Sequence, residues 1–106
     1  MKECSFNAPN MAFMFQVLVE SRTELLEDAT ERIVQLVRSL PCSPEDPDAV
    51  SLALSEALAN AIIHGNKEDP RKKVQVCGGC ENEGQLLLVI TDEEKGLTPQ
   101  LSRIRQ

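Results

Sequence analysis

Three polar side chains recur every four residues within one apolar stretch of the sequence: Glu56, Asn60 and His64. Four residues of an α-helix turn a side chain by only about 40°, so the three would form a ladder along one helix face. No Lys or Arg lies between Asp48 and Asn66 to neutralise the carboxylate. A carboxylate, a carboxamide and an imidazole that project together exchange protons and bind ions, so this spacing predicts a site.

The helix that carries this ladder is apolar on two further sides. Val50 and Leu54 begin one apolar stripe, while Leu52 and Ile63 belong to a nearly opposite one. A surface helix has a single apolar face, so we expect this helix to be sandwiched in a core. Buried there, Glu56 would need a partner, hydrogen bonds or a wet cavity. The alternative to a functional site is a buried structural triad whose polar groups are satisfied by the backbone.

Composition restricts the possible partners and the size of the core. With 106 residues, of which 42% are apolar, residues 1–106 are expected to form a single domain. The net charge is −6, and the one basic cluster, Arg71-Lys72-Lys73, follows Glu68 and Asp69, so no nucleic-acid partner is expected. No apolar run is long enough to span a bilayer and no signal peptide is recognisable, which predicts a cytoplasmic protein without a membrane partner.

Four cysteines, Cys4, Cys42, Cys77 and Cys80, raise three possibilities. Without a signal peptide, reduced thiols are the expected state rather than two disulfides. The Cys77-x-x-Cys80 spacing fits zinc, but such a site needs two further ligands from distant parts of the chain. A redox dithiol normally opens a helix, whereas this pair lies in a strand pattern. A small cysteine-based metal-binding domain is therefore a minor alternative.

The elements that position the ladder follow from the hydrophobic pattern. Residues 11–20 alternate with period two, which predicts a strand. Ser21-Arg22-Thr23-Glu24 matches a capping box, so a helix should begin there and continue to about Leu40. Asp46 before Pro47 should cap the second helix, which carries the ladder. Gly65 or Asn66 should close that helix in the left-handed conformation.

A hairpin follows the second helix. Residues 73–77 and 85–91 are strand-like and are separated by the turn residues 81–84. Gly78 and Gly79 weaken the first arm and predict a bulge. The apolar second strand leads into a charged loop that starts at Asp92, and residues 100–106 are too few to add much to a core.

Two separated segments together indicate a family: the helix with Glu56, Asn60 and His64-Gly65-Asn66, and Asp92 at a strand end, followed by Gly96. This combination resembles the GHKL (Bergerat-type) ATP-binding domain, and within it the anti-sigma-factor serine kinases. The resemblance spans roughly residues 13–99. It implies an α+β, two-layer α/β sandwich in which helices pack on one face of a mixed, mainly antiparallel sheet.

The resemblance also implies a role for each matching residue. Asn60 would coordinate magnesium through its carboxamide oxygen, and Glu56 would be the general base. Asp92 would accept a hydrogen bond from the adenine amino group. His64 and Gly65 would lie near the phosphates, although His64 could equally be a packed core histidine.

The chain departs from the family pattern after Asp92. The family loop runs Asp-x-Gly-x-Gly; here Glu94 stands at the first glycine, and Gly96 keeps the second. A glutamate adds a Cβ and a negative charge near an anionic ligand. The family's lid, second glycine-rich box and terminal strands are not expected within residues 1–106.

The implied function is an ATP-binding, anti-sigma-factor-type serine/threonine protein kinase that regulates transcription by partner switching. ATP and Mg²⁺ would be its cofactors, a sigma factor and an anti-sigma-factor antagonist its partners, and a homodimer its assembly. The alternative is a non-catalytic protein-interaction module derived from the same fold, which Glu94 and the missing glycine box motivate.

Overall fold

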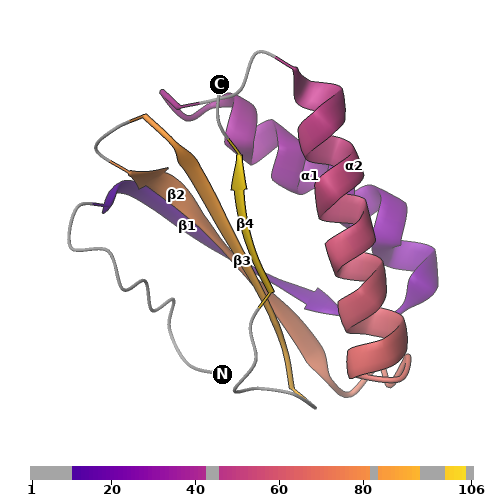
Figure 1. The fold of residues 1–106 in the computed structure, drawn as a ribbon. Coiled ribbons are helices and arrows are strands. Elements are labelled where there is room, and N and C mark those ends of the chain that lie inside the picture. The colour runs from indigo at the N-terminus through magenta and orange to yellow at the C-terminus, as the bar shows by residue number, and fades with distance from the viewer. Residues whose placement is uncertain (1–10, 43–45, 82–83, 94–99, 105–106) are drawn as a thin grey trace.

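The computed structural model describes residues 11–42, 46–81, 84–93 and 100–104, which form two layers (Figure 1). One layer is an antiparallel sheet with the strand order β1 (Met11–Glu20), β2 (Lys73–Glu81), β3 (Leu86–Asp92), β4 (Gln100–Ile104). The other layer holds α1 (Leu26–Arg38) and α2 (Pro47–Ala59) on one face of the sheet. The expected α+β two-layer architecture is confirmed. All pairings among the described strands are antiparallel, so a mixed sheet is not seen in this part of the chain.

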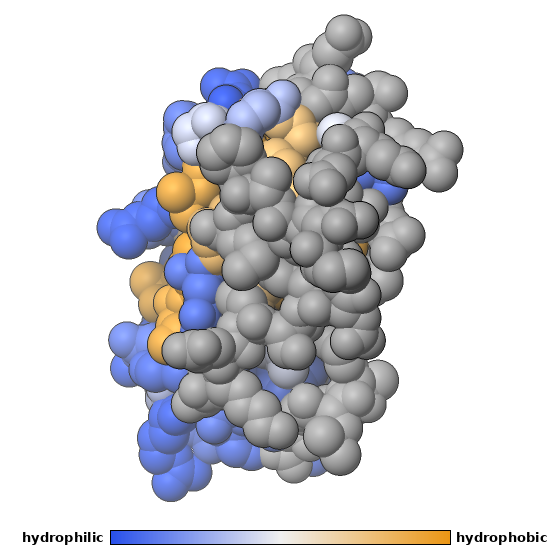
Figure 2. All heavy atoms as spheres, turned by 90° about the vertical axis from the view of Figure 1, so that its left-hand side faces the viewer, coloured by the Kyte–Doolittle hydropathy of each residue, from blue (hydrophilic) through white to orange (hydrophobic). Residues whose placement is uncertain are grey.

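Strand β1 has the bounds that its period-two pattern predicts. Val19 points to the helices and is buried, while its neighbour Leu18 points the other way and is 52% exposed. Figure 2 looks onto the side of the sheet opposite the helices, where described apolar residues form small groups among hydrophilic ones. The alternation of β1 therefore separates a core face from a mixed outer face.

The β2–β3 hairpin keeps its register through the two glycines, so the predicted bulge at Gly78 and Gly79 is wrong. Phe15 pairs with Gly78 across β1 and β2, and the Phe15 ring packs over that glycine. A Cβ on Gly78 would lie within 2.8 Å of both Phe15 and the Leu88 side chain. The glycine is there to make room for an aromatic ring, which is a packing role.

The predicted capping box at Ser21 and Glu24 is also wrong. Ser21 Oγ donates instead to Lys72 O at 2.9 Å, and the Glu24 carboxylate lies 3.7 Å from the Arg22 guanidinium. A single 3₁₀ turn, η1 (Thr23–Leu25), precedes α1 and has no side-chain cap. A contact with a residue 51 positions away thus takes the hydroxyl that the local motif would use.

Helix α2 begins as predicted but packs on one side only. The Asp46 carboxylate accepts from the amides of Asp48 and Ala49, and Pro47 occupies the first turn. Leu54 is 1% exposed, whereas Leu52 is 62% exposed. The expectation of a sandwiched helix is therefore wrong, because its second apolar stripe faces outward.

The core between the two layers contains aliphatic residues from both of them. Its members with at most 2% exposure include Ile33, Val37, Val50, Leu54, Leu58, Ile62, Val74, Val76, Leu86, Leu88 and Ile90. Aliphatic burial on this scale is the main source of stability in a domain of this size.

The expectation of reduced thiols is wrong for the three described cysteines, Cys42, Cys77 and Cys80. Cys42, after α1, forms a disulfide with Cys80 near the end of β2, with a Cα–Cα distance of 5.8 Å and a sequence separation of 38. Cys77 is disulfide-bonded as well. The described residues also contain no cluster of three or more His, Cys, Asp or Glu side chains that could hold a metal. The alternative of a cysteine-based metal-binding domain is therefore wrong.

The C-terminal part of the chain adds a strand that the sequence did not predict. Strand β4 pairs antiparallel with β3, from Leu86 opposite Ile104 to Ile90 opposite Gln100. It extends the sheet beneath α2. Among the helices of the described ranges, none combines the length and hydropathy that a bilayer crossing requires.

Candidate functional site

The ladder residues lie where α2 changes into a wider helical turn. The chain continues from Ala59 into a π-helical segment, η2 (Asn60–Gly65), and the Asn66 amide donates to Ala61 O, five residues back, at 2.8 Å. Asn66 has φ −86°, so the predicted left-handed closure at Gly65 or Asn66 is wrong. Lys67 and Glu68 take the positive φ values instead. Single π turns within helices are frequent at functional sites.

Glu56, Asn60 and His64 are all exposed on this helix. Within the described part of the chain, none of the three side chains forms a hydrogen bond or an ion pair with the protein. The alternative of a buried structural triad is therefore wrong, and His64 is not a packed core histidine. The three polar groups remain available to a ligand.

Gly65 brings the end of this helix against Asp92. Asp92 is the last residue of β3 and is only 7% exposed. A Cβ on Gly65 would lie no more than 3.0 Å from three atoms of the Asp92 side chain. The structure thus joins the two segments that the sequence singled out, 27 positions apart, and the contact requires glycine. A carboxylate in such a shielded place binds a hydrogen-bond donor more strongly than one in water does.

Asn66 is a central residue whose role the sequence pattern does not predict. Its side chain is fully buried, and Nδ2 donates to Ser21 Oγ at 2.9 Å and to Lys73 O at 3.0 Å. Its Oδ1 accepts from the Glu93 amide at 2.9 Å. Ser21, Lys73 and Glu93 come from the ends of three different strands, so only the tertiary fold reveals this role. The available sequence signal was a polar residue, Asn66, directly after the glycine that ends the helix.

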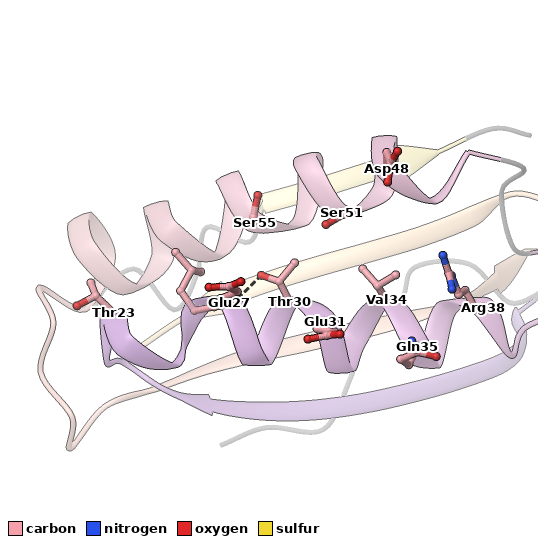
Figure 3. A pocket seen from close by; sticks show the side chains of 11 residues that line it. Thr23, Glu27, Thr30, Glu31, Val34, Gln35, Arg38, Asp48, Ser51 and Ser55 are labelled. Atoms are coloured by element: carbon pink, nitrogen blue, oxygen red, sulfur yellow. Dashed lines mark hydrogen bonds between the residues drawn. The ribbon is translucent and has the colours of Figure 1, made fainter.

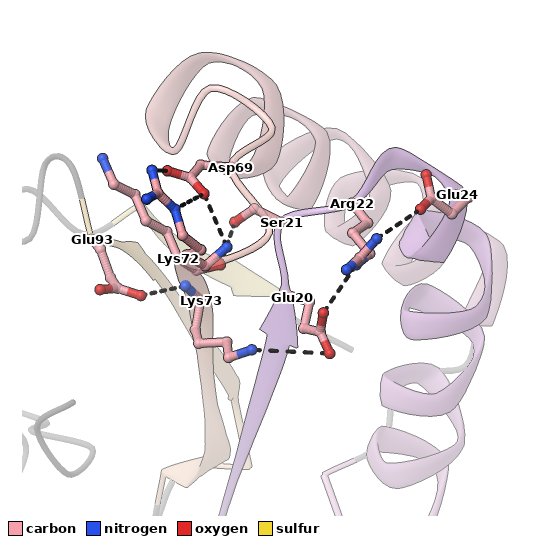
Figure 4. Close-up of polar contacts among 9 residues, drawn as sticks. Glu20, Ser21, Arg22, Glu24, Asp69, Lys72, Lys73 and Glu93 are labelled. Carbon is pink, nitrogen blue, oxygen red and sulfur yellow. Dashed lines mark hydrogen bonds and ion pairs between the residues drawn. The ribbon is translucent and has the colours of Figure 1, made fainter.

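Further polar contacts surround this corner of the molecule (Figure 4). The Lys73 amide donates to the Glu93 carboxylate, and Lys73 Nζ lies 4.0 Å from the Glu20 carboxylate. The hydrogen bond from Arg22, helped by the charge of Lys73, lowers the pKa of Glu20. These side chains are partly or fully exposed, so each ion pair adds little to stability.

A groove lies elsewhere, between α1 and α2 (Figure 3). Its volume is about 740 Å³, and it is lined mostly by polar side chains, among them Glu27, Glu31, Arg38, Asp48 and Ser51. It touches neither the ladder nor Asp92, so we do not assign the candidate site to it. Asp92 lies instead at the end of β3, and the family-motif positions Glu94 and Gly96 lie outside the described residues.

The donor set of the candidate site fits a metal ion that arrives with its own ligands. Among the described side chains, no cluster of three or more His, Cys, Asp or Glu lies at the site. Mg²⁺ characteristically takes one or two protein oxygens and completes its shell with phosphate oxygens and water. The exposed carboxamide of Asn60 can supply such an oxygen.

Comparison with known proteins gives two findings. Residues 19–105 match the family model of the histidine kinase-like ATPase domain. The chain is also similar to the anti-sigma F factor of Heyndrickxia coagulans, with 32% identity over 82 residues, which is 77% of this chain and 54% of that protein. The chain thus spans about half the length of this relative. The matched family region contains the ladder, Gly65, Asn66 and Asp92.

Proposed function

Because this chain belongs to the histidine kinase-like ATPase family, we propose that it acts as an anti-sigma-type serine/threonine kinase domain that uses Mg²⁺ and ATP. The observation that carries the proposal is the contact between Gly65 and Asp92. It joins an exposed polar helix to a buried carboxylate, and both segments are those of the family resemblance. The ATP-binding character of the family supports the choice of nucleotide.

Asp92 is the proposed contact for the nucleotide base. Its carboxylate can only accept hydrogen bonds when ionised, and adenine offers an amino group as a donor. Burial at the end of β3 removes competition from water. Asp92 would therefore hold and orient the base beside the backbone of Gly65.

Asn60 is the proposed protein ligand of Mg²⁺. A neutral oxygen adds no further negative charge to a site that also holds phosphate groups. Bound Mg²⁺ and ATP would supply the transferable phosphoryl group and offset its charge. Asn60 would fix the position of the phosphates relative to Glu56, one helical turn away.

Glu56 is the proposed general base. It is exposed and forms no ion pair with any described residue, so its carboxylate can accept a proton from an incoming serine hydroxyl. His64 would lie near the phosphates, whereas Gly65, against Asp92, would border the base. Gly96, outside the described residues, is proposed from the family motif as a further nucleotide contact.

The name of the anti-sigma F factor supports a sigma factor as a partner of this chain. A serine-bearing antagonist protein would be the phosphoryl acceptor, and release of the sigma factor would complete the partner switch. We further propose a cytoplasmic location and a homodimeric assembly. Light scattering coupled to size exclusion tests the assembly.

A non-catalytic interaction module is the second candidate function. Leu52 and Ile63 are 62% and 37% exposed on the helix that carries Glu56. Exposed aliphatic side chains at such positions suit protein contact. In this case partner binding would persist without phosphoryl transfer.

Phosphoryl transfer separates the two candidates. The chain is incubated with Mg²⁺, γ-labelled ATP and the antagonist protein, and phosphoserine is quantified. The kinase proposal expects transfer that falls by at least about a hundredfold in Glu56→Gln, the range of general-base catalysis. Glu31→Gln, an exposed change on α1, is the matched control and should retain transfer. Partner capture with no phosphoserine in the unmodified chain would favour the interaction module instead.

A further inference from the structure

Asn66 fixes the peptide group that follows Asp92. Its Oδ1 accepts from the Glu93 amide at 2.9 Å, and that amide belongs to the peptide bond joining Asp92 to Glu93. A peptide group is planar, so one hydrogen bond to its N–H also fixes the orientation of the Asp92 carbonyl. The backbone at the end of β3 is thereby held at the point where the chain enters the next loop.

The other end of the Asn66 carboxamide is anchored to the sheet. Nδ2 donates to Ser21 Oγ at 2.9 Å and to Lys73 O at 3.0 Å, and Ser21 Oγ in turn donates to Lys72 O at 2.9 Å. Asn66 is 0% exposed, so its amide cannot exchange these partners for water without local opening. The hydrogen bond to Glu93 therefore comes from a rigidly held acceptor.

Gly65 and Asn66 act on Asp92 from two sides. Gly65 lies against the carboxylate itself, because a Cβ would overlap with Asp92 side-chain atoms. Asn66 holds the adjacent backbone amide of Glu93. Two consecutive residues thus define both the side-chain environment and the backbone position of one carboxylate.

We propose that Asn66 is a positioning residue that sets the affinity and base selectivity of the nucleotide site through Asp92. This inference rests on the proposed function. Adenine presents an amino donor where guanine presents a carbonyl acceptor. A carboxylate held in one place accepts a hydrogen bond from the adenine amino group and repels the guanine carbonyl. A displaced carboxylate distinguishes the two bases less well.

The test compares the dissociation constants of Mg²⁺–ATP and Mg²⁺–GTP by calorimetry on the full chain. The unmodified chain should prefer ATP. Asn66→Ala should lose about tenfold in ATP affinity, which corresponds to one hydrogen bond of a buried side chain. The ratio of the GTP to the ATP dissociation constant should also fall toward one. Ser21→Ala is the matched control: it removes one anchor of Asn66 but leaves the bond to Glu93, so it should keep the nucleotide preference.

A second measurement does not depend on nucleotide. Amide exchange of Glu93, followed by NMR, should be protected in the unmodified chain and in Ser21→Ala but fast in Asn66→Ala. A second variant, Asn66→Asp, loses the donation to Lys73 O but keeps an acceptor for the Glu93 amide, and the Ser21 hydroxyl can turn to donate to its other oxygen. It should retain both protection and ATP preference.

The outcomes separate this inference from the proposed function. An unmodified chain that binds no ATP would overturn the proposed function and the nucleotide role of Asn66 together. ATP binding whose affinity and ATP/GTP ratio are the same in Asn66→Ala would overturn the positioning role alone. A loss of ATP preference in Asn66→Asp with the Glu93 amide still protected would also contradict it.

Discussion

Two asparagines six residues apart have opposite surroundings. Asn60 is exposed and, among the described residues, its side chain has no protein partner, whereas Asn66 is fully buried and bonded to three strand ends. The same residue type therefore stabilises the fold at position 66 and, in the proposed function, would bind a ligand at position 60. The motif therefore has two parts. We call the exposed ladder residues between Glu56 and His64 its chemical half, and the buried Gly65 and Asn66 its structural half.

The disulfide offers the largest expected change in stability and tests whether the structural half acts locally. Cys42–Cys80 ties the far end of β2, about seven residues from the strand end that Asn66 holds. Opening a loop of 38 residues should cost about 4 kcal/mol. Urea unfolding of Cys42→Ala/Cys80→Ala should show this loss, while ATP affinity in the folded protein stays within about twofold. An unchanged unfolding midpoint would contradict the structural role of the bond.

Substituting each asparagine by alanine tests the difference between the two halves. Asn66→Ala should lower the free energy of unfolding by about 3 kcal/mol, because it removes the hydrogen bonds of a fully buried side chain to Ser21, Lys73 and Glu93. Asn60→Ala should change it by no more than about 0.5 kcal/mol, as expected for an exposed site. Urea denaturation measures both variants. Equal losses in the two would remove the distinction between the halves.

Glycine 65 tests the boundary between the two halves. Gly65→Ala should cost about 2 kcal/mol by overpacking and should also weaken ATP binding, since its Cβ displaces Asp92. Gly78→Ala is the control, because it creates a similar overlap with Phe15 and Leu88, far from Asp92. It should destabilise the fold without changing ATP affinity. An ATP affinity that is unchanged in Gly65→Ala would contradict the proposal that Asp92 contacts the nucleotide.

The smallest effect concerns the turn between η2 and β2. Hydrogen bonds from the Arg71 side chain and backbone lower the pKa of Asp69 from 3.8 to about 2. A lowered pKa stabilises the folded state above pH 3.8, and this contribution disappears as the pH falls through about 2. Arg71 is exposed and Asp69 is partly exposed, so water screens the pair and the change in stability should be small. An NMR titration of the Asp69 carboxyl should show a midpoint near 2 that returns toward 3.8 in Arg71→Ala; a midpoint near 3.8 in the unmodified chain would refute the pairing.

Local patterns predicted much of the fold. The alternation of residues 11–20 gave the bounds of β1, and Asp46-Pro47 gave the start of α2, because strand pleat and helix capping depend on adjacent residues. The capping box failed because Ser21 bonds to Lys72, 51 positions away. The disulfide and strand β4 likewise depend on partners that only the folded chain brings close.

The candidate site likewise has features that local spacing predicts and features that depend on tertiary contacts. The spacing of Glu56, Asn60 and His64 revealed the ladder, and the structure shows these residues exposed. The contact of Gly65 with Asp92 and the role of Asn66 arise from packing between η2 and β3. A one-dimensional pattern contains no signal for a hydrogen bond that joins residues 66 and 93.

Titration of Mg²⁺–ATP into the unmodified chain and Asn60→Ala by calorimetry tests the central claim most directly. We expect saturable binding by the unmodified chain and a loss of at least about tenfold in affinity for Asn60→Ala at unchanged stability. Identical heats for the two proteins would contradict it.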